Sequence, residues 1–195
     1  HRISIFDKEG NFLRKWDQRG SANGELNGPS GLAFDAAGDL YVSDAGNHRI
    51  QKFKTDGTFL MNFGSYGSAK GEFDMPWGIA IDELDDIYVA DWRNDRVQKF
   101  SAEGEFLFQI GTSGCEDGEF NRPSGVEVDK DGDIYVADWA NHRIQLFGPD
   151  GHFVEKFIGD ATLSKQAKNY MESNVMALRM REMTSIELQK RLRWP

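Results

Sequence analysis

The sequence contains very little cysteine or proline and no long apolar segment. Cys115 is the single cysteine in 195 residues, so no disulfide can form within the chain. No run of 18 apolar residues is available to span a membrane as a helix. The amino-terminal residues do not have the layout of a signal peptide, although a cut end would have removed one. The compartment therefore stays open between extracellular or periplasmic and cytoplasmic.

Basic residues are in the minority over most of the chain. Residues 1–160 contain 16 Lys and Arg against 29 Asp and Glu, a net charge of −13. Residues 161–195 contain 7 Lys and Arg against 3 Glu, a net charge of +4. An acidic body repels a phosphate backbone, so nucleic-acid binding is disfavoured. Glycine is abundant, with 21 residues against 5 prolines, which suits many short strands joined by tight turns.

A period of 47 residues is the main positive feature of the sequence. The positions that recur at this spacing are Arg2, Arg49, Arg96 and Arg143; Gly10, Gly57, Gly104 and Gly151; Asp44, Asp91 and Asp138; and Pro29, Pro76 and Pro123. A fixed period of this length indicates an array of supersecondary units.

One repeat unit predicts four short antiparallel strands. Runs rich in β-branched and aromatic residues cover 78–82, 86–91, 96–100 and 104–111, and Gly, Asp or Asn lie in the turns between them. In the second run both alternate faces are apolar or small, as a sheet between two neighbouring sheets requires. Four antiparallel strands in each 40–50-residue unit describe a blade of a β-propeller.

The period also divides the chain. We expect an all-β fold of about three and a half blades: whole blades at 29–63, 76–110 and 123–157, and the outer two strands of a partial blade at 1–16. Residues 194–195 match the start of a further blade. Three and a half blades cannot close a ring, so we expect a fragment that needs the remaining blades of the same ring and has apolar faces at both ends.

Residues 160–193 interrupt the repeat with a predicted α-helical insertion of about 25 extra residues. Leu163, Ala167, Tyr170 and Met171 form an amphipathic stripe, and the segment starting at Thr184 resembles a capping box. This segment either caps the propeller or serves as a lid or docking arm for a partner.

The recurring motifs resemble those of the NHL-repeat family. They are Pro-x-Gly, (I/L)-Y-V-(A/S)-D, N-H-R-I-Q-x-F and D-G-x-F, and together they cover residues 1–159. The resemblance implies a β-propeller, usually with six blades. Animal relatives are often tripartite-motif ubiquitin ligases that bind proteins or RNA, and a related minority are lyases with a metal in the central channel. The string at 157–165 (FIGDATLSK) resembles that of bacterial, free-standing members, which favours that type.

Several polar sets are expected to be structural because they repeat. The pairs Asp44–Arg49, Asp91–Arg96 and Asp138–Arg143 flank four-residue turns, where a carboxylate and a guanidinium can fix the hairpin. The histidines His1, His48 and His142 lie in different blades and cannot converge on one ion, and Asp95 replaces the histidine in one unit. The acidic segment 129–133 lacks the spacing of an EF-hand calcium loop. No metal site and no cofactor is therefore predicted.

The turns at one face carry the candidate ligand-binding residues. Exposed Trp and Arg side chains are common anchors of binding patches, and this set contains Trp77, Trp92, Arg93, Trp139, Tyr66 and Arg122. Glu127 is a second candidate, because Ala33 and Ala80 stand at its equivalent positions on the innermost strand, where a carboxylate in the axial channel could bind a ligand.

These features favour a non-enzymatic propeller scaffold that binds a protein or small ligand through the turns of one face and the helical insertion. One alternative is a channel-centred lyase or hydrolase, which Glu127 alone supports. The other is an RNA- or protein-binding propeller like those of tripartite-motif ligases. Whether the protein is an enzyme stays open, with a binding role favoured.

Overall fold

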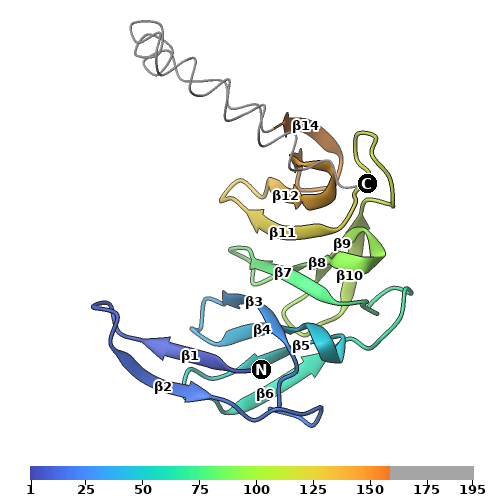
Figure 1. Ribbon diagram of the computed structural model, residues 1–195. Helices are drawn as coiled ribbons and strands as arrows, with labels where there is room; N and C mark the ends of the chain where they lie inside the picture. The colour runs from blue at the N-terminus through green and yellow to red at the C-terminus, as the bar shows by residue number, and fades with distance from the viewer. Residues whose placement is uncertain (159–195) are drawn as a thin grey trace, which may run out of the picture. The chain divides into compact units, whose positions relative to one another are not determined.

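Short strands in four antiparallel sheets make up the computed structural model, which describes residues 1–158 (Figure 1). The sheets follow the repeat, and we number them as blades 1 to 4. Blade 1 contains β1 (Ile3–Phe6) and β2 (Phe12–Trp16). Blade 2 contains β3 (Pro29–Phe34), β4 (Leu40–Asp44), β5 (Arg49–Phe53) and β6 (Phe59–Phe63). Blade 3 contains β7 (Pro76–Ile81), β8 (Ile87–Asp91), β9 (Arg96–Phe100) and β10 (Phe106–Ile110). Blade 4 contains β11 (Pro123–Val128), β12 (Ile134–Asp138), β13 (Arg143–Phe147) and β14 (Phe153–Ile158).

The predicted helical insertion at 160–193 and the predicted blade start at 194–195 lie outside the described residues. Within residues 1–158 the helical segments are three single 3₁₀ turns: η1 (Ala45–Asn47), η2 (Trp92–Asn94) and η3 (Trp139–Asn141). None of these is long enough to cross a membrane.

Each blade is a meander in which strands adjacent in the sequence pair antiparallel. The two central strands of blade 2 pair without interruption from Leu40 opposite Phe53 to Asp44 opposite Arg49. A 3₁₀ turn joins these strands, and His48 closes it in the left-handed conformation with φ 54°. Blades 3 and 4 repeat this arrangement.

The blades approach one another most closely at their innermost strands, β3, β7 and β11, which lie side by side (Figure 1). Glycine permits this approach. A Cβ atom on Gly78 would lie 2.7 Å from the Cα of Gly125, and one on Gly31 would lie 2.3 Å from the carbonyl oxygen of Trp77. The Pro-x-Gly motif therefore sets the spacing between neighbouring sheets.

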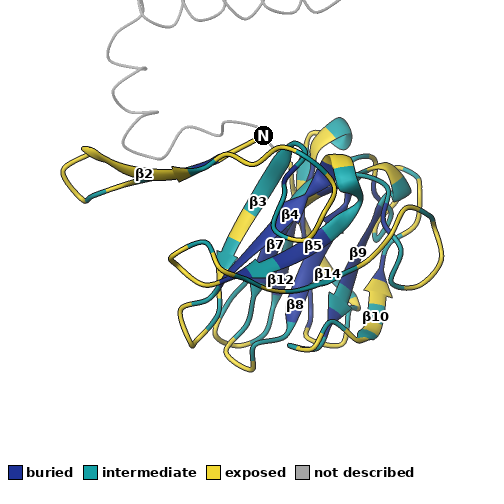
Figure 2. Ribbon diagram, turned by 90° about the horizontal axis from the view of Figure 1, so that it is seen from below, coloured by how far each residue is buried: buried dark blue, intermediate teal, exposed yellow. Residues whose placement is uncertain are grey.

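The core lies between the blades rather than within one sheet. The central strands β4, β5 and β8 are buried in Figure 2, whereas β2 is largely exposed. One cluster joins Tyr41 of blade 2 to Ile79 and Phe100 of blade 3, and a second joins Tyr88 of blade 3 to Val126 of blade 4. This confirms the predicted all-β fold, in which the central strands are covered on both faces.

The two ends of the blade stack expose apolar side chains that are buried elsewhere. Leu32 and Phe34 are 51 % and 62 % exposed on one end face. At the other end, Ile144 is 45 % exposed, whereas its equivalent Ile50 is fully buried under blade 3. Within residues 1–158 these faces match the apolar surfaces that the sequence predicts for the blades at the ends of the stack.

Candidate binding surface

A buried aspartate organises the turn between the second and third strands of each whole blade. In blade 3, Asp91 Oδ2 accepts hydrogen bonds from Arg96 Nε at 2.8 Å, Asn94 Nδ2 at 2.8 Å and Gln98 Nε2 at 3.2 Å. Its Oδ1 accepts the backbone N–H of Asp74 at 2.8 Å. Burial raises the pKa of Asp91, and these donors oppose the rise. The carboxylate is therefore held by four donors in the blade interior.

The same network fastens each turn to the connection that enters its blade. Arg96 donates to the carbonyl oxygens of Ser68, Ala69 and Glu72, and Gln98 donates to that of Glu72. The three predicted Asp–Arg pairs are all in contact, at 2.9, 2.8 and 2.7 Å in blades 2, 3 and 4. Sequence reasoning missed two further members that recur with the same period, Asn47, Asn94 and Asn141, and Gln51, Gln98 and Gln145.

The histidine position joins one blade to the next. Nδ1 of His1 accepts the backbone N–H of Gly28 at 2.7 Å, and Nδ1 of His48 accepts that of Met75 at 3.1 Å. In blade 3 the carboxylate of Asp95 takes over this role and accepts the N–H of Arg122 at 2.8 Å. We call this contact the inter-blade latch. Among residues 1–158 no group of three His, Cys, Asp or Glu side chains is arranged to hold a metal ion.

The exchange of His for Asp in the latch is matched by a second exchange. The ring of His48 contacts Tyr66 edge to face, with 4.8 Å between centroids. At the equivalent positions of the next unit, Ser113 Oγ donates to Asp95 Oδ2 at 2.8 Å. A hydrogen bond has therefore replaced an aromatic contact, and the latch geometry is kept.

Four of the six predicted anchor residues meet at one junction, between blades 3 and 4. Trp77 is the second residue of the inner strand β7, Trp92 and Arg93 lie in η2, and Arg122 precedes β11. The two indole rings are 5.5 Å apart between centroids, and both guanidinium groups lie over the Trp92 ring, Arg122 at 5.1 Å and Arg93 at 5.7 Å. We call these four residues the Trp92 patch.

The Trp92 patch combines exposed aromatic surface with positive charge. Trp77 is 40 % exposed, Trp92 is half-buried, and the Arg93 side chain is 50 % exposed. Arg93 lies 3.9 Å from the Asp74 carboxylate, the outer limit of an ion pair. Arg122 donates to the carbonyl oxygen of Arg93 at 3.1 Å, and within residues 1–158 no carboxylate lies within ion-pair distance of it. Arg122 thus has no carboxylate partner in the described part of the chain and Arg93 has one long contact, so both guanidinium groups can reach an added anionic group.

The patch occupies positions that carry small or apolar residues in the preceding repeat unit. Ala45, Gly46 and Ser30 stand where Trp92, Arg93 and Trp77 stand in blade 3, and Met75 stands where Arg122 stands. Ser30 Oγ links neighbouring blades by donating to the carbonyl oxygen of Pro76 at 3.0 Å. Within residues 1–158 the Trp77 indole forms no equivalent hydrogen bond to β11, so this link between blades is missing at the junction of blades 3 and 4.

The other two predicted anchors lie apart from this patch. Tyr66 is 69 % exposed and contacts His48 at the junction of blades 2 and 3. Trp139 is 63 % exposed in η3 of blade 4 and has no aromatic or cation–π contact within the described residues. The sequence could not separate the converging side chains from the isolated ones.

Glu127 lies in β11 and lines a cavity of about 240 Å³ with Tyr135, Ala137 and Ile144. Its equivalent in blade 3, Ala80, is buried in the same cluster as Val126 of blade 4. In that blade the position therefore faces the following sheet rather than an axial channel. None of the Trp92 patch residues lines the cavity.

Several solved structures are similar to this chain over most of its length. Virginiamycin B lyase from Staphylococcus aureus aligns with a TM-score of 0.61 and 18 % identity, over 82 % of this chain and 49 % of the lyase. A protein of unknown function from Bacteroides caccae gives 0.58 and 16 %, over 80 % and 54 %. Glutaminyl cyclase from Myxococcus xanthus gives 0.53 and 15 %, over 80 % and 57 %. The chain spans about half the length of these proteins, and at such identities the likeness shows the fold alone.

Comparison with curated proteins returns no match. The family model described as NHL repeat matches three times, at residues 26–53, 73–100 and 120–147. Each match begins in the connection before a blade and ends with the blade's third strand, so it spans the Asp-Asn-Arg-Gln network. The matches recur at the 47-residue period and coincide with the four-stranded blades, so this chain belongs to the NHL-repeat family of β-propeller proteins.

Proposed function

We propose that this protein is a non-enzymatic scaffold that binds a protein or small ligand through the Trp92 patch. The observation that carries the proposal is the position of the patch within the repeat. Residues 45, 46, 30 and 75 of the preceding unit form the same turns without any of these side chains. The fold therefore does not require them, and their convergence at one junction supports a role in recognition.

The chemistry of the patch favours a ligand that offers a carboxylate next to an apolar or aromatic group. The two indoles supply rigid apolar contact area, and Arg93 and Arg122 supply donors for an anionic group. Trp and Arg are the residue types most often found to dominate binding energy at interfaces. The predicted helical insertion at 160–193 lies outside the described residues, so the proposal rests on the Trp92 patch.

Selection of short peptides from a displayed random library tests this function. The variants Trp77→Ser, Trp92→Ala with Arg93→Gly, and Arg122→Met each install the residue that the preceding unit carries. We expect selected peptides to lose at least about tenfold in affinity for these variants, because anchor residues contribute about 2 kcal/mol or more. Trp139→Ala, an exposed tryptophan outside the patch, serves as the matched control and should leave affinity unchanged.

Two results would contradict the proposal. The first is equal binding of the selected peptides to wild type and to the variants at unchanged thermal stability. The second is an equal loss of affinity in the Trp139→Ala control, which would point to a diffuse surface rather than to this patch.

A further inference from the structure

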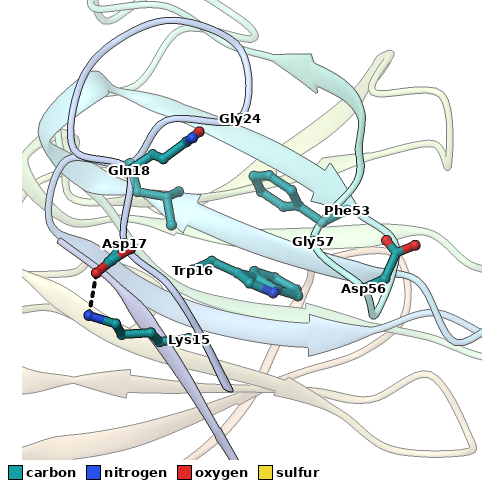
Figure 3. A pocket seen from close by; sticks show the side chains of 9 residues that line it. Lys15, Trp16, Asp17, Gln18, Gly24, Phe53, Asp56 and Gly57 are labelled. Atoms are coloured by element: carbon teal, nitrogen blue, oxygen red, sulfur yellow. Dashed lines mark ion pairs between the residues drawn. The ribbon is translucent and has the colours of Figure 1, made fainter. Parts of the chain in front are cut away.

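A second cavity lies on the outer rim, between β2 and the turn that joins β5 to β6 (Figure 3). Its volume is about 290 Å³. Its lining residues are Lys15, Trp16, Asp17, Gln18, Gly24, Leu26, Phe53, Asp56 and Gly57. All of them belong to blade 1, blade 2 or the connection between the two, so the cavity is separate from the Trp92 patch. We call it the Trp16 cavity.

A departure from the repeat opens this cavity. At the next two junctions a phenylalanine, Phe73 or Phe120, fills the equivalent space and lies directly on a glycine. A Cβ atom on Gly64 would lie 2.4 Å from the Phe73 ring, and one on Gly111 would lie 2.2 Å from the Phe120 ring. At the first junction the phenylalanine is replaced by Leu26 and the glycine by Asp17. The smaller Leu26 side chain leaves the volume of part of a phenyl ring, and Asp17 brings a carboxylate to its edge.

The inner wall of the Trp16 cavity is apolar and aromatic. The Trp16 indole packs on Phe53 with 5.6 Å between ring centroids, in the place where Phe63 packs on Phe100 at the next junction. Phe53 and Leu26 are each 2 % exposed, whereas Trp16 is partly accessible. An accessible indole beside buried apolar groups provides a surface for the C–H face of a ring.

The rim of the cavity presents hydrogen-bonding groups of both charge signs, one ammonium and two carboxylates. Lys15 and Asp17 form an ion pair at 2.5 Å on one side of Trp16, and Asp56 lies on the other side (Figure 3). The Lys15 ammonium lowers the pKa of Asp17, so this carboxyl stays an ionised acceptor. Gln18 adds an amide to the rim. The rim therefore offers donors and acceptors to hydroxyl groups without the single-sign charge that selects an ion.

We propose that the Trp16 cavity binds a neutral polyhydroxylated ring, a single sugar unit. The apolar face of such a ring packs against Trp16 and Leu26, while its hydroxyl groups exchange hydrogen bonds with Asp17, Gln18 and Asp56. The volume, near the lower limit of about 300 Å³ for small-molecule pockets, fits one ring rather than a longer chain. An anion is disfavoured because two carboxylates, Asp17 and Asp56, lie on the rim, and a cation would meet the Lys15 ammonium beside Asp17.

Titration with the methyl glycosides of glucose, galactose, mannose and N-acetylglucosamine tests this site, with choline and inorganic phosphate as charged comparators. Binding is measured by calorimetry and by protein NMR on the full chain. We expect saturable binding of at least one glycoside. The double variant Leu26→Phe with Asp17→Gly copies the next two junctions, and we expect it to weaken binding by about tenfold or more because the phenyl ring fills the cavity. Its thermal stability should equal or exceed that of wild type.

Two cross-tests distinguish binding at the Trp16 cavity from binding at the Trp92 patch. Glycoside binding should survive Trp92→Ala with Arg93→Gly, and peptide binding at the Trp92 patch should survive the cavity-filling variant. The inference is overturned if no glycoside binds, if choline or phosphate binds in place of the glycosides, or if the folded cavity-filling variant binds as wild type does.

Discussion

The turns of blades 2 and 3 have the same backbone conformation but expose different side chains. Both contain a single 3₁₀ turn closed by a left-handed residue, and both hold a buried aspartate with the same Asn, Arg and Gln donors. Outside this shared interior, blade 2 presents Ala45 and Gly46, whereas blade 3 presents Trp92 and Arg93. The same five-residue segment therefore holds the buried side chains of the scaffold and, under the proposed function, the exposed side chains that bind the ligand, and the two sets can be altered separately.

Removing the buried aspartate that both turns share should have the largest effect on the free energy of unfolding. Asp91→Ala leaves Arg96 buried without its carboxylate, and the loss of a buried partner destabilises by about 3–5 kcal/mol. Arg93→Gly, two residues away, installs the residue of blade 2 and should change stability by less than about 0.5 kcal/mol. Urea unfolding of both variants measures the contrast. Similar losses in the two would show that the interior and the surface of this turn are not separable.

Exchanging the latch residues should have an intermediate effect. Asp95→His alone removes the hydrogen bond from Ser113, and we expect a loss of about 0.5–1.5 kcal/mol. Adding Ser113→Tyr recreates the His48–Tyr66 pair of the preceding unit and should recover most of that loss. A double-mutant cycle in urea measures the coupling between the two sites. Strict additivity would mean that the two exchanges are unrelated.

Supplying a missing cation in blade 4 should have the smallest effect. Lys52 bridges Asp35 at 2.7 Å and Asp39 at 3.4 Å in blade 2, and Lys99 bridges Asp82 and Asp86 in blade 3. Leu146 stands at this position in blade 4, opposite Tyr135 and near the acidic turn 129–133. Leu146→Lys should stabilise the protein by about 0.5 kcal/mol at neutral pH, the usual range for a partly exposed ion pair.

The pH dependence of this gain follows from the pair in blade 2. Burial acts to raise the pKa of Asp35, but the Lys52 ammonium and the N–H of Asp39 outweigh it and lower that pKa. A carboxyl with a lowered folded-state pKa contributes stability above the unfolded value of about 3.9, and this contribution disappears as the pH falls through the folded value. The gain from Leu146→Lys, measured by thermal unfolding, should therefore disappear at acidic pH, once the carboxyls of the turn are protonated. A gain that persists there would reflect packing rather than charge.

The periodic features of this molecule could be predicted from sequence, and the convergent ones could not. The 47-residue spacing predicts the blades and the Asp91–Arg96 pair because both depend on contacts that every unit repeats. Trp92 and Trp77 are 15 residues apart, and which exposed aromatics meet depends on how the inner strand begins relative to η2. Trp139 satisfied the same sequence criteria and remained isolated.

The Trp16 cavity was missed for a different reason. The exchange of Phe for Leu26 and of Gly for Asp17 is visible when the units are aligned. Its meaning depends on a contact between residues 64 and 73 that only the folded chain shows. Once that contact is known, the combined replacement of Phe by Leu26 and of Gly by Asp17 indicates a cavity between the two positions.

The inter-blade latch has a consequence for how this chain reaches its native state. Every latch joins residues 27 positions apart, as in His1 with Gly28, His48 with Met75 and Asp95 with Arg122. Blade-to-blade docking therefore needs no closure of long loops, and relative contact order stays low as units are added. A chain built in this way can fold sequentially behind the ribosome, each unit docking on its predecessor soon after its first strand emerges.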